Sequence, residues 1–287
     1  MGEVQRLNGI VRALEAGQRA FGAFVPPEVD AALSFSVSKY DGIILEMEHN
    51  PWDVRTLRDC LQYMLNRRQI LDAGSPAPAV TPIVRIPPNG IEKNSWLAKQ
   101  ALDLGAYGIV WPHVYTMDQA YNAVAACRYP RLKNAPLYEP AGVRGDAPTA
   151  AARYWGIPAD EYYKRADVWP LNPQGEILVA LMIESTQGIA SLPDILKNVP
   201  GIGLVLIGEG DLSQELGIPR QYENPVLLEA MAQVVKTCKE HNVAVGHPHV
   251  DSKNVDRILK EGYRMLIAAP TRDYSALDKG RQLAGRT

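Results

Sequence analysis

The chain has 287 residues, of which 46% are hydrophobic and 22% are charged, a composition typical of a globular protein with a large core rather than of a disordered chain. Thirty basic residues against thirty-two acidic ones give a net charge of -2, and without a basic cluster the sequence does not favour binding to nucleic acid or to an anionic membrane. The apolar runs are shorter than the roughly 20 residues of a membrane helix, and residues 1–20 show helical spacing rather than a signal peptide. We therefore expect a cytoplasmic protein.

Eight short apolar segments, each typical of a buried strand, alternate along the chain with segments of helical periodicity. The expected strands are residues 20–25, 42–49, 81–86, 107–114, 177–184, 203–210, 243–250 and 264–270. Two of the intervening helices end in glycine, in LDLG at 102–105 and LKEG at 259–262, as expected of a C-cap that leads into the next strand. The pattern predicts an α/β fold, a single (β/α)8 TIM barrel over residues 1–287.

One long connection interrupts this alternation at about residues 131–176, where Pro, Gly and Tyr are dense and the periodicity fades. We expect short helices in it and no second domain. A connection of this length is more typical of a functional lid, a binding loop or a contact arm than of a plain linker. The three cysteines lie far apart in expected helices without CxxC spacing, so buried thiols are favoured over disulfides.

Charged and polar side chains follow the ends of several expected strands, where a barrel of this type has its active site. They are Glu46, Glu48 and His49 after the second strand, Arg85 after the third, His113 after the fourth, Glu184 after the fifth, Glu209 and Asp211 after the sixth, and His247 and His249 after the seventh. Alternate residues of a strand share a face, so we expect Glu46 and Glu48 on one side and His49 on the other.

Glu184 and Asp211 stand at the ends of neighbouring strands and can therefore meet at the mouth of the barrel. Such a pair of carboxylates suits a hard divalent cation such as Mg²⁺ or Mn²⁺. The alternative is that each acid only caps the helix that follows it, and the residues alone leave both interpretations open. His247 and His249 share a strand face, but two histidines make an incomplete zinc site, so a structural or substrate-side role is favoured for them.

Some of the remaining polar residues are expected to be structural. His113 is interpreted as part of the barrel wall. Asp53 precedes a helical segment and is expected to be its N-cap.

Several motifs occur in an order typical of one family: EMEHNPWD at 46–53, PIVRIP at 82–87, KQALDLGAYGIVWPHV at 99–114, GVRG at 142–145, IES at 183–185 and GEGDLS at 208–213. With these motifs the chain resembles the HpcH/HpaI family of class II pyruvate aldolases, whose type member cleaves 4-hydroxy-2-oxoheptane-1,7-dioate. The resemblance implies a (β/α)8 barrel that forms a homo-oligomer, a hexamer or a trimer, with a C-terminal helix that is exchanged between subunits in many members.

The resemblance also implies a chemistry. A divalent metal (Mg²⁺, Mn²⁺ or Co²⁺) would be held by Glu184 and Asp211, and a 2-oxo acid, pyruvate or oxaloacetate, would bind it through its carboxylate and keto oxygens. Cleavage of the C3–C4 bond leaves an enolate, whose charge the cation and Arg85 would stabilise. The expected reaction is the reversible cleavage of 4-hydroxy-2-oxo acids to pyruvate and an aldehyde.

Three further roles follow from the resemblance. His49 would help to remove the proton from the C4 hydroxyl, a task that suits its near-neutral pKa. Asp103, in the LDLGA motif, would reach the site of a neighbouring subunit and orient this base. The backbone amides of Gly210 and Asp211 would receive the substrate carboxylate, because glycine allows close approach to the backbone.

The sequence departs from the family pattern at several places. Met182 stands where the family usually has Gln, and Glu46 stands where Asp is common. Glu209 replaces a Pro; if it points inward, it should weaken binding of the anionic substrate or recruit a cationic partner such as arginine. Residues 132–141 are an insertion before GVRG, and we expect substrate specificity to change with it.

Other functions have less support. A class I aldolase needs a lysine at a strand end for its Schiff base, and none of the expected strands ends in Lys. A macrophomate-synthase-like enzyme, an oxaloacetate decarboxylase or an acyl-CoA lyase of the same superfamily would use the same enolate chemistry. A barrel that binds a 2-oxo acid without catalysis is disfavoured, because the residues matching the family's catalytic set are retained.

Overall fold

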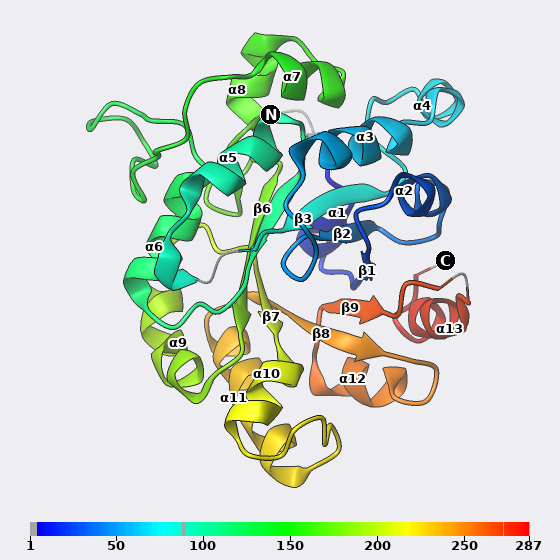
Figure 1. Cartoon of the computed structure of the whole chain (residues 1–287), viewed down its shortest axis with the longest axis vertical. Coiled ribbons are helices and arrows are strands. Elements are labelled where there is room, and N and C mark those ends of the chain that lie inside the picture. The colour runs from blue at the N-terminus through cyan, green and yellow to red at the C-terminus, as the bar shows by residue number, and fades with distance from the viewer. Residues whose placement is uncertain (1–4, 88–89, 272, 287) are drawn as a thin grey trace.

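The computed structural model describes residues 5–87, 90–271 and 273–286. Eight parallel strands follow one another around a closed barrel, and β1 pairs with the last strand while β4 pairs with β6 (Figure 1). The strands are β1 (Ala20–Val25), β2 (Gly42–Glu46), β3 (Thr81–Arg85), β4 (Gly108–Trp111), β6 (Ile177–Ile183), β7 (Leu204–Ile207), β8 (Ala244–Val250) and β9 (Met265–Ala268). A short strand, β5 (Val168–Trp169), pairs with the start of β6. The predicted (β/α)8 barrel is confirmed.

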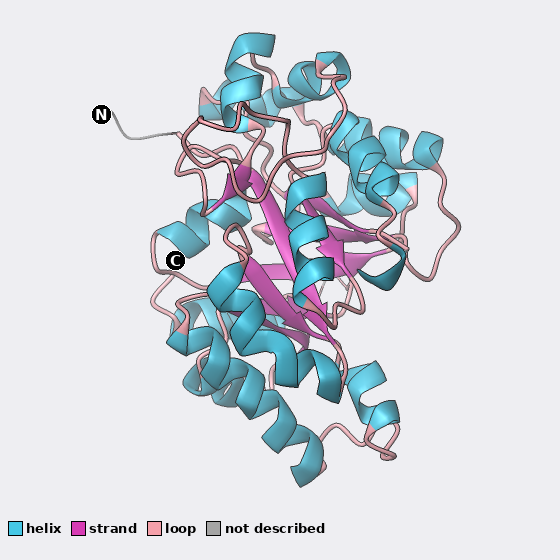
Figure 2. Cartoon of the chain, turned by 90° about the vertical axis from the view of Figure 1, so that its left-hand side faces the viewer, coloured by secondary structure: helices cyan, strands magenta, loops and turns pink. Residues whose placement is uncertain are grey.

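Helices surround the barrel on its outer side (Figure 2). They are α1 (Gly9–Glu15), α2 (Val29–Phe35), α3 (Val54–Met64), α4 (Arg67–Ala73), the 3-10 helix η1 (Gly90–Glu92), α5 (Ser95–Asp103), α6 (Met117–Ala126), α7 (Thr149–Trp155), α8 (Ala159–Arg165), α9 (Thr186–Asn198), α10 (Glu209–Glu215), α11 (Pro225–Glu240), α12 (Val255–Glu261) and α13 (Ser275–Leu283). Asp53 accepts a hydrogen bond from Arg55 N at the start of α3, as predicted for an N-cap. Within the described ranges, no helix is long and apolar enough to span a bilayer.

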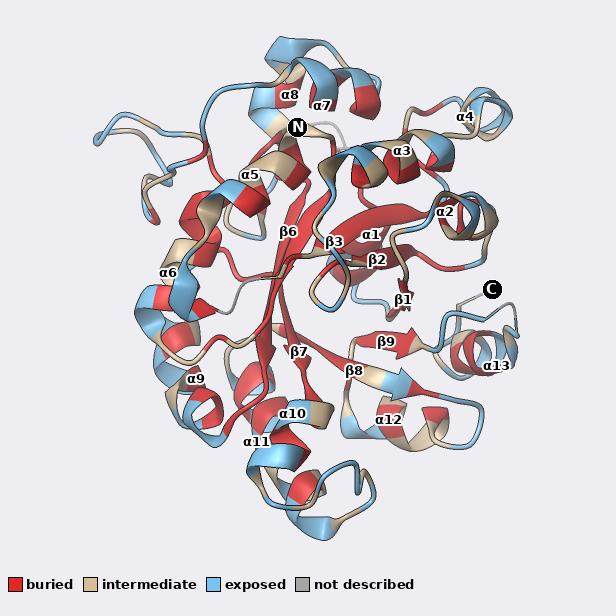
Figure 3. Cartoon of the chain, viewed as in Figure 1, coloured by how far each residue is buried: buried red, intermediate tan, exposed pale blue. Residues whose placement is uncertain are grey.

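The strands are buried because the barrel interior covers one face and the helices cover the other (Figure 3). The sequence ILVALMI of β6 is buried at every position, which explains why its apolar run is continuous rather than alternating. Cys60, Cys127 and Cys238 are buried and form no disulfide, in agreement with the sequence analysis.

Three strands, β2, β4 and β7, end three residues earlier than the sequence predicts, and all three differences affect the candidate site. β2 ends at Glu46 instead of His49, because the Glu46 carboxylate accepts hydrogen bonds from the backbone N–H groups of Glu48 and His49 and turns the chain. β4 ends at Trp111 instead of Val114, which leaves His113 outside the strand. β7 ends at Ile207, and α10 begins two residues later. Asp211 therefore lies in the first turn of a helix and not on a strand.

The long connection at residues 131–176 contains α7, α8 and β5, so the expected short helices are confirmed. It joins α6 to the start of β6 and therefore lies at the N-terminal end of the barrel. Hydrogen bonds hold the connection at this end: Trp155 Nε1 donates to the Gly105 carbonyl at 2.9 Å, and Arg128 Nε donates to Asp167 at 2.7 Å. This position excludes a lid over the strand carboxyl ends of the same chain, while a contact arm to another subunit stays a prediction.

The C-terminal helix α13 packs against its own barrel. A Cβ on Gly280 would lie 2.7 Å from the ring of Phe21 in β1, and Lys39 Nζ lies 3.0 Å from Asp278 Oδ1. Exchange of this helix between subunits stays a prediction.

Candidate metal centre and active site

Glu184, Asp211 and His113 come together at the C-terminal end of the barrel. One ligand atom from each lies within 4.8 Å of the other two. Glu184 directly follows β6, Asp211 lies in the first turn of α10, and His113 lies two residues after β4. The N-caps of α9 and α10 are Ser185 and Gly208, so the alternative in which the two acids only cap helices is wrong.

The backbone around Glu184 fixes its carboxylate. β6 and β7 pair at Ile183 and Ile207, which puts Glu184 beside Gly208. The backbone N–H of His113 donates to Glu184 Oε1 at 2.7 Å, and a Cβ on Gly208 would lie 2.0 Å from Oε2. The side chain is 1% exposed, and this burial raises the pKa of Glu184 to about 7. Two carboxylates and an imidazole whose ligand atoms lie within 4.8 Å of one another fit a divalent cation, which would favour the ionised form of Glu184.

Substitution of Gly208 by Ala should therefore damage the metal centre. The added Cβ would overlap the Glu184 carboxylate and displace it, so we expect the affinity for Mn²⁺ to fall at least about tenfold, or roughly 1.4 kcal/mol. Isothermal titration calorimetry measures this directly. Gly210→Ala is the matched control: its Cβ meets no described atom within 4 Å, so Mn²⁺ affinity should be retained. Equal losses in the two variants would contradict the role given to Gly208.

Arg85 is held by two acids at the end of β3. The guanidinium forms an ion pair with Glu46, its direct neighbour across the β2–β3 pairing, and NH1 lies 2.9 Å from Glu48 Oε2. Both acids thus contact the same guanidinium, but β2 ends at Glu46, so the alternation predicted for Glu48 and His49 within a strand does not apply. NH1 also lies 3.6 Å from Met182 Sδ, so the thioether is a weak acceptor for Arg85. The plane of Arg85 lies over the Phe24 ring, 4.7 Å from its centroid.

Two histidines lie near the Glu48 carboxylate. His49 is 68% exposed, with Nε2 3.7 Å from Glu48 Oε2. His113 is half-buried: Nε2 lies 3.4 Å from Glu48 Oε1 and Nδ1 lies 3.7 Å from Glu184 Oε1. The hydrogen bond with Glu48 raises the pKa of His113 above its ordinary value. Sequence reasoning assigned His113 to the wall and missed this contact, although its place after a strand end is the signal that identified the other site residues.

Asp103 lies away from these residues. It ends α5, shortly before β4 begins, and so lies at the N-terminal end of the barrel. Arg144 NH2, from the GVRG motif, donates to Asp103 Oδ1 at 2.9 Å and to the Tyr162 hydroxyl at 2.8 Å. Burial raises the pKa of Asp103, although Arg144 opposes this shift. Within one chain Asp103 does not join the site, and its contribution to a neighbouring subunit stays a prediction.

Glu209 points toward β8. Its side chain is 3% exposed, forms a hydrogen bond with His249 Nδ1 and lies 3.9 Å from His247 Nε2. An inward-pointing Glu209 was expected to weaken substrate binding or to recruit a cationic partner such as arginine. The side chain instead contacts two histidines on the outer flank of the barrel, so the condition for that expectation is not met. These contacts explain how a carboxylate is accommodated one residue from Gly210.

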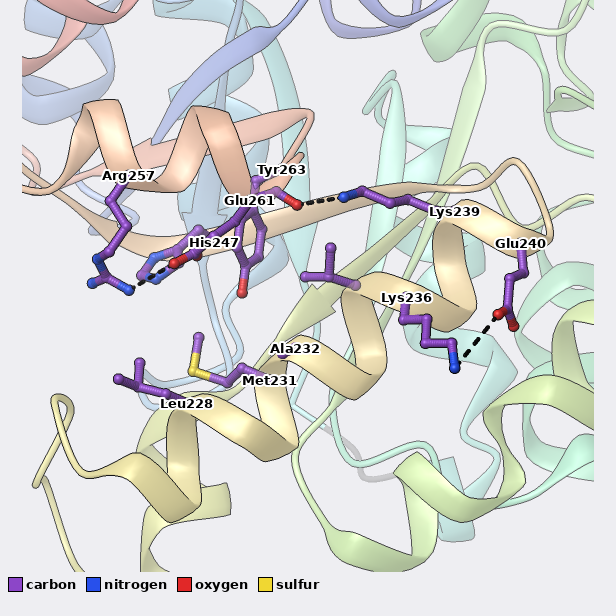
Figure 4. A pocket seen from close by; sticks show the side chains of 11 residues that line it. Leu228, Met231, Ala232, Lys236, Lys239, Glu240, His247, Arg257, Glu261 and Tyr263 are labelled. Atoms are coloured by element: carbon purple, nitrogen blue, oxygen red, sulfur yellow. Dashed lines mark hydrogen bonds and ion pairs between the residues drawn. The ribbon is translucent and has the colours of Figure 1, made fainter.

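His247 also borders a cavity of about 400 Å³ between α11 and α12 (Figure 4). Leu228 and Met231 of α11 face it from one side, and Arg257 and Tyr263 face it from the other. The Tyr263 ring meets His247 edge-on, with centroids 5.0 Å apart. The cavity lies on the flank of the barrel, and neither Glu184 nor Asp211 lines it.

Burial lowers the pKa of His247 to about 4, against an opposing effect of Glu209. The unfolded chain takes up this proton near pH 6.5 and the folded chain only near pH 4, so folding stability should decrease as the pH falls through this window, by up to about 3 kcal/mol. Urea unfolding at several pH values should show a smaller decrease for His247→Phe, which keeps the aromatic contact. His241→Gln, a histidine at the end of α11, should retain the wild-type slope; an unchanged slope in His247→Phe would contradict the assignment.

Comparison with known proteins agrees with this geometry. Residues 21–270 match the family model for HpcH/HpaI aldolase/citrate lyase. The hydroxypyruvate/pyruvate aldolase of Roseobacter denitrificans is 30% identical over 265 residues, or 92% of this chain and 91% of that protein. The 4-hydroxy-2-oxo-heptane-1,7-dioate aldolase of Shigella sonnei is 29% identical, with coverage of 89% and 86%. The crystal structure of an aldolase/citrate lyase family protein from Burkholderia cenocepacia superposes with a TM-score of 0.75 at 27% identity, with coverage of 96% and 97%.

Proposed function

Because the chain belongs to the HpcH/HpaI aldolase/citrate lyase family and is therefore a carbon–carbon lyase, we propose that it cleaves and forms 4-hydroxy-2-oxo acids, with pyruvate and an aldehyde as the products of cleavage. The observation that carries the proposal is the convergence of the Glu184 and Asp211 carboxylates at the barrel mouth. The two aldolases compared above are named for 2-oxo acids, which supports the same substrate class here.

Glu184 and Asp211 would hold the divalent cation, Mg²⁺, Mn²⁺ or Co²⁺. When bound, the cation would offset the negative charge that develops on the keto oxygen as the C3–C4 bond breaks. The two acids contribute a net charge of about -2 at the site when both are ionised, so a divalent cation brings the local charge close to neutral and allows an anionic substrate to approach.

Arg85 would direct a guanidinium N–H to the same developing oxyanion. Glu46 and Glu48 hold the guanidinium in one orientation, so the donor is in place before charge develops, which is the condition for large electrostatic stabilisation. The first-turn amides of Gly210 and Asp211 have no partner within α10 and would receive the substrate carboxylate. The open space next to Gly210 supports this assignment.

His49 would accept the proton of the C4 hydroxyl during cleavage and return it during synthesis. Its exposure and its proximity to Glu48 support a base that exchanges protons with solvent. Asp103 of a second subunit would orient His49, which requires a homo-oligomer, a hexamer or a trimer. This assembly, the participation of residues 131–176 in it, and a cytoplasmic location belong to the same proposal.

A direct test uses 4-hydroxy-2-oxo acids of different chain length with Mn²⁺, and detects released pyruvate with lactate dehydrogenase and NADH. We expect metal-dependent release of pyruvate from at least one of them. Oxaloacetate serves as the comparison substrate, because a decarboxylating enzyme of the macrophomate-synthase type would release pyruvate from it as well. Decarboxylation of oxaloacetate with no cleavage across the aldol panel would replace the aldolase proposal by that alternative.

A further inference from the structure

His113 lies beside Glu184 and Asp211, although the proposed reaction gives it no role. Its Nδ1 lies 3.7 Å from Glu184 Oε1, and its ring belongs to the cluster in which every ligand atom is within 4.8 Å of the others. The backbone turns after β4 and returns to β6, where Val114 N donates to the Met182 carbonyl at 3.2 Å. This return brings the His113 ring over the end of β6.

The second ring nitrogen of His113 has an acidic partner of its own. Nε2 lies 3.4 Å from Glu48 Oε1, and Glu48 is itself fixed by Arg85 at 2.9 Å. A histidine that binds a metal through one nitrogen typically donates the other N–H to a carboxylate, which sets the tautomer and orients the ring. An imidazole that donates Nε2–H to Glu48 presents the lone pair of Nδ1 to Glu184.

The backbone of His113 is held in an uncommon conformation. Its φ is 52°, in the left-handed region that residues other than glycine seldom adopt. The same residue donates its N–H to Glu184 Oε1, so one strained residue positions both the carboxylate and the imidazole. Residues held in this way are concentrated at functional sites. The Tyr115 hydroxyl, 3.1 Å from Nδ1, is the neighbour that a cation would displace from this nitrogen.

We propose that His113 is a third protein ligand of the metal, through Nδ1, with Glu48 as the carboxylate that orients it. The inference rests on the proposed metal-dependent function and deepens it. Compared with two carboxylates alone, a site with an added nitrogen ligand prefers different metals. Imidazole favours Co²⁺, Zn²⁺ and other transition ions, whereas Mg²⁺ prefers oxygen ligands. The chain should therefore bind Co²⁺ much more tightly than Mg²⁺.

Electron spin echo envelope modulation of the Mn²⁺-loaded protein tests the assignment without any substrate. Nitrogen bonded to Mn²⁺ modulates the echo, so the wild-type protein should show ¹⁴N modulation, which is replaced by the ¹⁵N pattern when its histidines are labelled with ¹⁵N. His113→Met should lose the modulation, and His49→Gln, which removes the other histidine beside Glu48, should retain it. Calorimetry should show at least about a tenfold loss of Co²⁺ affinity in His113→Met with little change for Mg²⁺, and a loss of about 10- to 100-fold for Co²⁺ in Glu48→Gln.

The outcomes separate the two proposals. Mn²⁺ binding to the wild-type protein without nitrogen modulation would overturn the role of His113 and leave the metal-dependent lyase standing. Modulation that persists in His113→Met, or that disappears only in His49→Gln, would also overturn it. Absence of Mn²⁺ binding by calorimetry would overturn both proposals. If His113→Met does not fold, the labelled wild-type protein still decides, and His113→Gln provides a second variant.

Discussion

Asp211→Asn should lower kcat/KM for pyruvate-forming cleavage at least about a thousandfold, equivalent to roughly 4 kcal/mol of transition-state stabilisation. Asn has nearly the size of Asp but lacks its charge, and Asp211 is one of two carboxylates in the cluster with Glu184. Asp211 lies in the first turn of α10 with its side chain exposed, so the substitution should leave the fold intact. The coupled pyruvate assay gives the rate, and calorimetry gives the loss of metal affinity.

The matched control is Asp194→Asn, which removes an exposed carboxylate from α9. It should behave as the wild-type protein in both measurements. Wild-type activity in Asp211→Asn at a saturating metal concentration would show that the reaction does not depend on this acid.

Arg85→Lys should lower kcat by about 100- to 1000-fold while leaving metal affinity nearly unchanged. Lysine keeps the positive charge between Glu46 and Glu48 but lacks the planar fork that contacts both acids and that, in the proposed reaction, would direct a third N–H to the oxyanion. Loss of one such donor typically costs this much in kcat. Single-turnover measurement of the bond-cleaving step would separate this effect from product release.

Arg85→Met tests the structural part of the same network. Without a cation, Glu46 and Glu48 face each other as partly buried charges, so we expect the free energy of unfolding to fall by about 3 kcal/mol or more, measured with urea. The Lys variant should keep most of this stability. An equal loss of kcat with no difference in stability between Lys and Met would contradict the view that the two acids orient Arg85 by charge.

The barrel could be predicted from the sequence because each strand is a short apolar run between amphipathic helices. The convergence of the two carboxylates followed from topology: Glu184 and Asp211 come after consecutive strands of a parallel barrel, and the ends of such strands are neighbours. The residues at which the strands end could not be predicted as well. The hydrogen bonds of Glu46 to the two following N–H groups stop β2, and periodicity carries no information about a side chain that turns its own backbone.

Contacts between distant segments could not be predicted. Arg144 reaches Asp103 from the long connection, and Glu209 meets the histidines of β8; both depend on how connections fold over the ends of the barrel. His113 was underestimated for a different reason. A lone histidine after a strand is most often structural, and only the turn that brings Val114 to Met182 places its ring beside Glu184.

The central claim, that the site stabilises a pyruvate enolate with a divalent cation, is tested most directly without any choice of aldehyde. Exchange of the pyruvate methyl protons with D₂O can be followed by NMR with Mg²⁺, and parallel samples can receive EDTA alone or EDTA followed by excess Mg²⁺. We expect exchange that the protein catalyses, that EDTA abolishes and that excess Mg²⁺ restores. Exchange that continues unchanged in EDTA, or no exchange above the protein-free rate with any of Mg²⁺, Mn²⁺ or Co²⁺, would contradict the account.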